Sequence, residues 1–117
     1  MGPPDLSPFP PVVRDKARVR LGDVCWRTDD AEEAIRAIAA TGYVVLGLDL
    51  QKLHTDGGVM ELAWSNFEPD RQISYPVNVD ASRRAALEAL ARDDKPSDFE
   101  WVRVVWASPG SLSWSAR

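Results

Sequence analysis

The pattern of apolar and polar positions is clearest in residues 43–54, where it repeats every second residue. The aliphatic positions of one face are Val44, Leu46, Leu48 and Leu50, and the other face carries Tyr43, Val45, Gly47, Asp49 and Gln51. A period of two predicts a β-strand with one face in the core. A second run, residues 59–64, follows a glycine-rich break, so we expect the two runs to pair as a hairpin.

The break between these runs reads Thr-Asp-Gly-Gly over residues 55–58. Asp56-Gly57 suits the two central positions of a type I′ turn, which need positive φ angles. This register predicts four cross-strand pairs: His54 with Val59, Lys52 with Glu61, Leu50 with Ala63, and Asp49 with Trp64. A turn centred on Gly57-Gly58 would instead set His54 opposite Glu61, so the register stays open.

The residues before the first strand follow the 3.6-residue period of a helix, from about residue 29 to residue 41. Asp29 is placed to cap its first turn, and Glu32 to return the bond in a capping box. Gly42 suits the left-handed residue that ends a helix. The apolar stripe comprises Ala31, Ala34, Ile35, Ile38 and Ala39.

Two further elements are expected in the second half of the chain. Asp80 is placed to cap a helix over residues 81–92. Residues 99–107, FEWVRVVWA, are aromatic and β-branched on both faces, which predicts a strand inside the sheet. Residues 17–26 alternate charged and aliphatic side chains and suit a short, half-exposed strand.

The order of short strand, helix, hairpin, helix and strand predicts an α+β fold. We expect a small two-layer domain, with a mostly antiparallel sheet and two helices packed on one face. Residues 17–117 would form this single domain, which is large enough to bury a core. Residues 1–16 hold five of the nine prolines and little to bury, so they predict a flexible, proline-rich arm.

Charge and cysteine content narrow the classes of function. The net charge of −4, from 18 carboxylates against 14 Lys and Arg, disfavours nucleic acid and anionic membranes and favours a basic partner. Cys25 is the only cysteine, so no intrachain disulfide forms. The start of the chain lacks a signal-peptide pattern, and no apolar run reaches the roughly 18 residues of a membrane span. We expect a cytoplasmic protein that binds neither nucleic acid nor membrane.

Groups suited to catalysis or metal binding are few. His54 is the only imidazole and lies far in sequence from Cys25, which disfavours a nucleophile and base pair. The sequence does not contain the sets of Cys and His residues that bind zinc. It also does not contain acidic residues at the spacing of a calcium-binding loop. No glycine-rich phosphate loop precedes a helix. We expect no catalytic residue, no metal and no cofactor, and keep a small carboxylate-site enzyme as an alternative.

One group of residues around the predicted hairpin combines carboxylates with a tryptophan. We predict it to be the partner-binding surface, and it comprises Asp49, Glu61, Trp64, Asn66, Glu68 and Asp70. An aromatic anchor ringed by acids has the composition of a contact surface for a cationic protein. The competing interpretation is that the aromatic side chains belong to the core and the acids only solvate a loop. For Trp64 both interpretations stay open.

Residues 28–70 read TDDAEEAIRAIAATGYVVLGLDLQKLHTDGGVMELAWSNFEPD. This run resembles a family of small immunity proteins from bacterial polymorphic-toxin systems. That family's pattern is an acidic-capped helix, a strand bearing Gly-x-Asp and Leu, a short turn, and a strand ending in an Asn-aromatic step near an Asp. The matching positions are Gly47, Asp49, Leu53, Asn66, Phe67 and Asp70. Leu48 and Phe67 depart from the family's usual Gly and Trp.

The resemblance implies an intracellular antidote that binds and blocks a cognate toxin domain without performing chemistry. Our first hypothesis is therefore an immunity protein acting through its acidic and aromatic surface. The alternatives are the small carboxylate-site enzyme and a structural or regulatory adaptor without a toxin partner. The oligomeric state stays open, because an exposed sheet edge can pair with a second copy.

Overall fold

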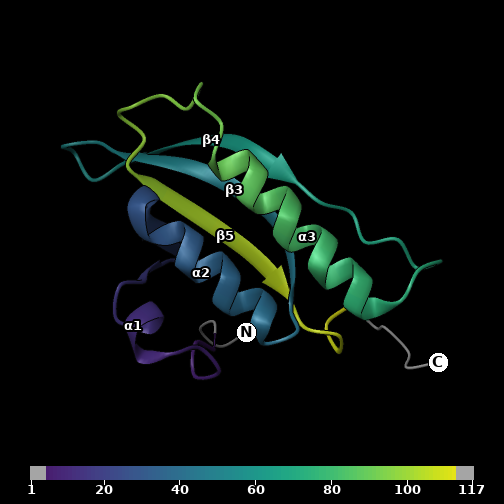
Figure 1. Cartoon of the computed structure of the whole chain (residues 1–117). Coiled ribbons are helices and arrows are strands. Elements are labelled where there is room, and N and C mark those ends of the chain that lie inside the picture. The colour runs from purple at the N-terminus through teal and green to yellow at the C-terminus, as the bar shows by residue number, and fades with distance from the viewer. Residues whose placement is uncertain (1–4, 113–117) are drawn as a thin grey trace.

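The structure is a computed structural model that describes residues 5–112 and contains three helices and five strands there (Figure 1). The helices are α1 Pro11–Arg14, α2 Thr28–Ala40 and α3 Tyr75–Leu90, and the strands are β1 Arg18–Arg20, β2 Asp23–Arg27, β3 Val44–Leu53, β4 Val59–Asn66 and β5 Trp101–Ala107. All strand pairs are antiparallel, in the order β1-β2-β5-β3-β4. The predicted α+β class is confirmed, and so is the position of the last strand inside the sheet, although that strand begins at Trp101 and not at residue 99.

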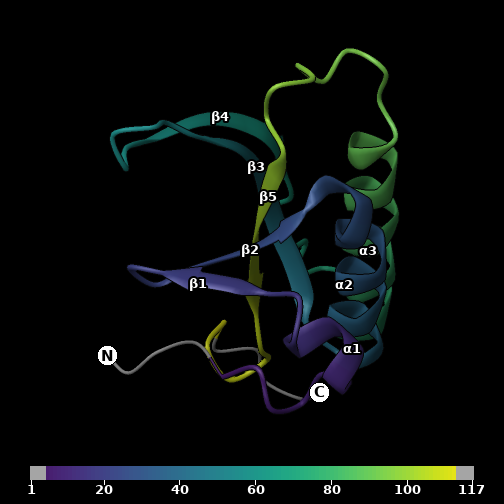
Figure 2. The same cartoon turned by 90° about the vertical axis from the view of Figure 1, so that its left-hand side faces the viewer.

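The core lies between the sheet and the two long helices, which cover the same face (Figure 2). Leu48 and Leu50 of β3 and Val102 and Val104 of β5 are buried beneath them. The five apolar residues predicted for the stripe of α2 are all buried. The three alanines among them let α2 sit close to the sheet, since alanine adds little thickness between backbone layers.

Both long helices begin earlier than predicted, and neither has a side-chain cap. α2 starts at Thr28, so Asp29 lies in its first turn, where its charge still suits the helix dipole. α3 starts at Tyr75, because Pro76 in the first turn has the φ angle that a helix start needs. Asp80 therefore lies inside α3 and pairs with Arg83 at 2.6 Å. Gly42 follows α2 with φ +88°, as predicted.

The expectation that residues 1–16 have little to bury is wrong for the described part of this segment. Phe9 and Val13 are 2% and 3% exposed and belong to the main core. The ring of Phe9 meets that of Trp106 edge-on, with centroids 5.5 Å apart. Trp26 donates its indole N–H to the Val13 carbonyl at 2.8 Å. Residues 5–16 thus close one side of the core, and residues 1–4 lie outside the described range.

The β3–β4 turn differs from the predicted type I′ turn by one residue. His54 N–H donates to the Gly58 carbonyl at 2.9 Å, and Gly57 has φ +89°, which describes a three-residue loop with a glycine bulge. The longer loop shifts the register, so Glu61 lies opposite Gln51. A shift of one residue moves a side chain to the other face of a sheet. Glu61 therefore shares a face with Gln51, and the predicted pair with Lys52 is wrong.

Asn78 fixes the connection between β4 and α3. Its side chain is fully buried and donates from Nδ2 to the carbonyls of Asp70 and Ser74, at 2.9 and 3.0 Å. Its Oδ1 accepts from the Asp70 N–H at 2.7 Å. A buried amide with these partners uses both its donor and its acceptor capacity. The loop before α3 is thereby tied to the helix by one side chain.

We predict that Asn78→Asp lowers the free energy of unfolding by about 3 kcal/mol, because a buried carboxylate would replace an N–H₂ group that faces two carbonyl oxygens. Urea denaturation at pH 7 measures the change. The control, Asn66→Asp, adds the same charge at an exposed position and should stay within about 0.5 kcal/mol of the parent. Equal effects of the two substitutions would contradict the assigned role of Asn78.

Candidate functional site

The sheet face opposite α2 and α3, which we call the open face, is not covered by any helix in the described residues (Figure 2). Both hairpins, β1–β2 and β3–β4, bend away from the helices and frame this face. Residues paired across neighbouring strands point to the same side of a sheet. The strand registers thus form two rows on the open face: Arg18, Cys25, Arg103 and Asp49 in one, and Arg27, Trp101, Gln51 and Glu61 in the next.

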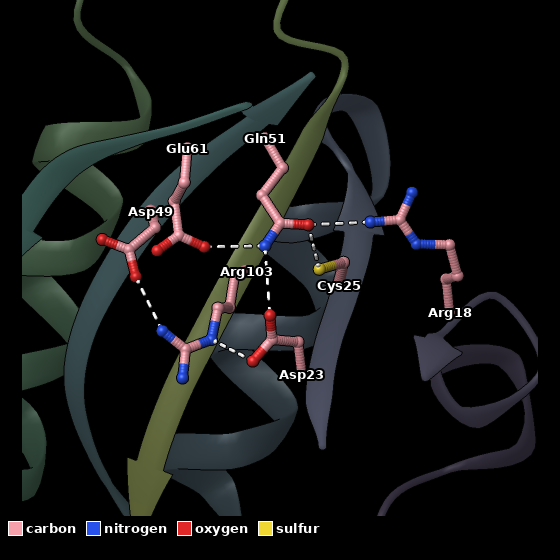
Figure 3. A network of polar contacts seen from close by, with 7 residues as sticks. All are labelled: Arg18, Asp23, Cys25, Asp49, Gln51, Glu61 and Arg103. Carbon is pink, nitrogen blue, oxygen red and sulfur yellow. Dashed lines mark hydrogen bonds and ion pairs between the residues drawn. The ribbon is translucent and has the colours of Figure 1, made fainter. Parts of the chain in front are cut away.

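Gln51 is the centre of a polar network on this face (Figure 3). Its side chain is only 2% exposed, and its amide oxygen accepts from Arg18 Nη2 at 2.8 Å and from the Cys25 thiol at 3.1 Å. Its amide nitrogen donates to Glu61 at 2.7 Å and to Asp23 at 3.3 Å. All four hydrogen-bonding positions of the amide are thus used. The partners come from β1, β2 and β4, so one side chain links the strands across the face.

Arg103 extends the network along the central strand β5. Its Nε lies 2.9 Å from Asp23 and its Nη1 lies 3.0 Å from Asp49. One guanidinium therefore holds a carboxylate from β2 and another from β3. The geometry suits arginine, whose planar group presents several N–H donors in fixed directions. We call these seven side chains the open-face network: Arg18, Asp23, Cys25, Asp49, Gln51, Glu61 and Arg103.

Burial and charge shift the acid–base behaviour of two network members. Burial raises the pKa of Asp49, and the nearby Glu61 carboxylate raises it further, against the opposing effect of Arg103. Burial also raises the pKa of the Cys25 thiol, although the positive charge of Arg18 acts in the other direction. Cys25 is therefore a neutral hydrogen-bond donor at pH 7, which is not the thiolate that nucleophilic attack requires.

A cationic stack borders the network at the β1 and β2 side. The guanidinium carbon of Arg18 lies 4.2 Å from the centre of the Trp101 ring, and that of Arg27 lies 5.0 Å from it. Both distances are within the range of a cation–π contact. Trp101 is half-buried between these side chains. The open face is therefore basic and aromatic at one side and acidic, with Asp49 and Glu61, at the other.

The structure does not bring the six predicted partner-binding residues onto one surface. Asp49 and Glu61 lie together on the open face. Trp64 lies on the opposite side, where its indole N–H donates to the Ala89 carbonyl of α3 at 2.7 Å. The register shift between Leu48 and Asp49 leaves Trp64 unpaired on β4, which turns it toward the helix. The remaining three are exposed at the far end of β4 and in the loop beyond it: Asn66, Glu68 and Asp70.

The network members that the sequence patterns did not single out are Arg18, Asp23, Cys25, Gln51 and Arg103. Arg103 had a usable signal, because a charged residue in the middle of the apolar run 101–107 needs a partner once that strand is central. Arg18 and Arg20 also alternate with aliphatic residues, as on a two-faced strand. Gln51 gave no such signal in the sequence, because a single glutamine in a strand is common on a face that contacts solvent.

The described residues contain no group of three or more His, Cys, Asp or Glu side chains placed to hold a metal ion. In the same part of the chain, no helix has the length and apolar character that crossing a membrane requires. What the arrangement offers is a set of fixed charges of both signs on a sheet face that no helix of residues 5–112 covers. Such a set can bind complementary charges, because its groups are already oriented.

We predict that Asp49→Asn raises the free energy of unfolding at pH 7, by at most about 1 kcal/mol after solvent screening. Folding raises the pKa of Asp49 above 3.8, which means that the folded state favours the protonated acid. The protonated acid therefore adds to the free energy of unfolding at low pH, and this contribution is lost as the pH rises through the pKa of the folded state. Asn resembles the neutral acid, so the gain should shrink as the pH falls from 7 toward 4. Urea denaturation across this pH range measures it.

Asp80→Asn is the control of opposite sign, because the hydrogen bond from Arg83 lowers the pKa of Asp80. That variant should be less stable than the parent at pH 7. If Asp49→Asn is also less stable at pH 7, the ion pair with Arg103 outweighs the cost of burial.

Comparison of this chain with protein-family models, with curated proteins and with solved structures finds no match. No relative therefore supplies an activity or a partner that could be transferred.

Proposed function

We propose that this chain is a binding protein that captures another protein on its open face. We further propose that the partner is a bacterial toxin domain, which the resemblance of residues 28–70 to immunity proteins implies. The observation that carries the proposal is the open-face network, whose charges are held in fixed directions on an uncovered sheet face. The proposed class of function is recognition without catalysis.

The network is suited to recognition because its side chains are already ordered. Binding normally costs free energy for immobilising long side chains, and a network that fixes them in advance lowers this cost. Glu61 is exposed and accepts a hydrogen bond from Gln51 at one carboxylate oxygen, so its carboxylate keeps further acceptor positions. Asp49 likewise accepts from Arg103 at one oxygen. A cation from the partner can add to both carboxylates without displacing the contacts that hold them.

One observation favours the carboxylate-site enzyme, namely the raised pKa of Asp49 beside Glu61, since catalytic acids often have shifted pKa values. The shape of the site favours binding instead. Cavities of about 460 and 220 Å³ border the network, and neither is lined by Asp49 or Glu61. Within residues 5–112, neither cavity encloses these two acids as a site for a small substrate would. An assay of ester, sugar and phosphate hydrolysis by the parent and by Asp49→Asn distinguishes the two functions.

We predict that Glu61→Lys weakens capture of the proposed toxin domain by at least about tenfold, because it places a cation where the partner's cation would bind. Isothermal titration calorimetry with that purified domain measures the affinity. The control, Glu88→Lys, makes the same charge change at an exposed position on α3, in the helical layer, and should bind as the parent does.

Equal weakening by Glu61→Lys and Glu88→Lys would mean that total charge, and not the open face, determines binding. Tight binding by both variants would place the contact surface elsewhere on the molecule. Circular dichroism of each variant shows whether the fold is retained, and growth rescue of cells that express the toxin domain gives a second readout.

A further inference from the structure

A cleft of about 220 Å³ lies between the tips of the two hairpins on the basic side of the open face. One wall comes from β1 and its turn, and the other from the glycine turn that precedes β4. Its lining residues are Arg18, Arg20, Leu21, Asp23, Gln51, Gly57, Gly58 and Val59. We call this the hairpin cleft. Arg20 bridges it, donating from Nη2 to the Gly57 carbonyl at 2.6 Å.

The two arginines of the cleft are held by neutral acceptors. Arg18 donates to the amide oxygen of Gln51 and Arg20 to a backbone carbonyl, and no carboxylate lies within ion-pair distance of either among the described residues. The Nε and Nη1 atoms of Arg18 are buried without a hydrogen-bond partner in this part of the chain. A buried cation without a counter-ion is costly, so an anion placed beside it is favoured.

The acid that lines the cleft does not neutralise these cations. Asp23 directs one oxygen to Arg103 at 2.9 Å and accepts from Gln51 at the other. Because the N–H₂ group of Gln51 faces Asp23 and Glu61, its oxygen is turned toward Arg18. The amide thus separates the acidic side of the network from the basic cleft. Arg20 therefore remains the exposed cation available to an acceptor from outside, and the buried guanidinium of Arg18, which stacks on Trp101, adds a second positive charge beside it.

We infer that the hairpin cleft binds a carboxylate group of the partner protein, supplied by an Asp or Glu side chain that enters between the hairpin tips. Arg20 is exposed and has five N–H donors, of which the Gly57 carbonyl takes one, so it can contact the ligand directly. Arg18 also lines the cleft and contributes its positive charge. Leu21 and Val59 give the cleft apolar walls, which suit the methylene groups of such a side chain.

The volume and the walls favour a protein side chain over a larger anion. Pockets for cofactors and nucleotides usually exceed about 300 Å³, whereas this cleft is smaller. The inference deepens the proposed capture of a protein, and its biological role rests on that proposal. Under this inference the partner has two charged groups in its contact surface. Its carboxylate binds in the hairpin cleft, and its cation binds Asp49 and Glu61.

The test uses the ¹⁵N-labelled full chain and a neutral-capped peptide, acetyl-Leu-Glu-Leu-amide, followed by NMR. We expect saturable shifts of the Gly57 and Gly58 amide signals, with a Kd on the order of 1–10 mM for so small a ligand. Acetyl-Leu-Gln-Leu-amide should give no saturable shift, because it lacks the charge. Arg20→Gln should weaken binding at least about fivefold, whereas Arg36→Gln, which removes a cation from exposed α2 surface, should leave it unchanged.

Three outcomes would overturn the inference: no saturable shift with the Glu peptide, equal binding of the Gln peptide, or equal weakening by Arg20→Gln and Arg36→Gln. Inorganic phosphate is titrated in parallel, and tighter saturation by phosphate through Arg20 would overturn the assignment to a carboxylate. Since these titrations contain no partner protein, their failure leaves the proposed capture through Asp49 and Glu61 standing. Failure of capture would equally leave anion binding by the cleft intact.

Discussion

The open face depends on the buried amide of Gln51. Burying a polar side chain costs free energy unless its donors and acceptors are satisfied, and this amide meets that condition with four partners from three other strands. The same bonds fix the direction in which its neighbours point. Glu61 and Asp23 are held on its nitrogen side, and Arg18 on its oxygen side. The placement of charges over the sheet therefore follows from the orientation of a single neutral group.

The sequence predicted the parts of the fold that depend on local periodicity. The stripe of α2, the end of α2 at Gly42 and the central position of β5 each follow from residue spacing or composition within one segment. The starts of α2 and α3 were missed, because the expected capping acids lie inside the helices and Pro76 sets the start of α3. Burial of Phe9 was missed for a different reason, since its contacts with Tyr43 and Trp106 are distant in sequence.

The candidate site was harder to predict than the fold. Asp49 and Glu61 were identified from their charge, but a turn one residue longer than a type I′ turn determines which face Glu61 occupies. For Trp64 the surface and core interpretations both stayed open, and the bulge in β4 turns its side chain toward α3. The network itself joins five strands from both halves of the chain, so no local pattern contains it. Only the strand order makes Arg103 a neighbour of both Asp23 and Asp49.

The arrangement of charge also bears on how selective the open face can be. A face of one sign attracts every partner of the opposite sign, whereas a face with an acidic and a basic side requires both charges at the right separation. The raised pKa of Asp49 means that its charge is held there at a cost in stability. An uncharged side chain would pack at this position without that cost. Retaining ionised groups on a sheet face that could have been apolar makes sense if the charges are used to discriminate between partners.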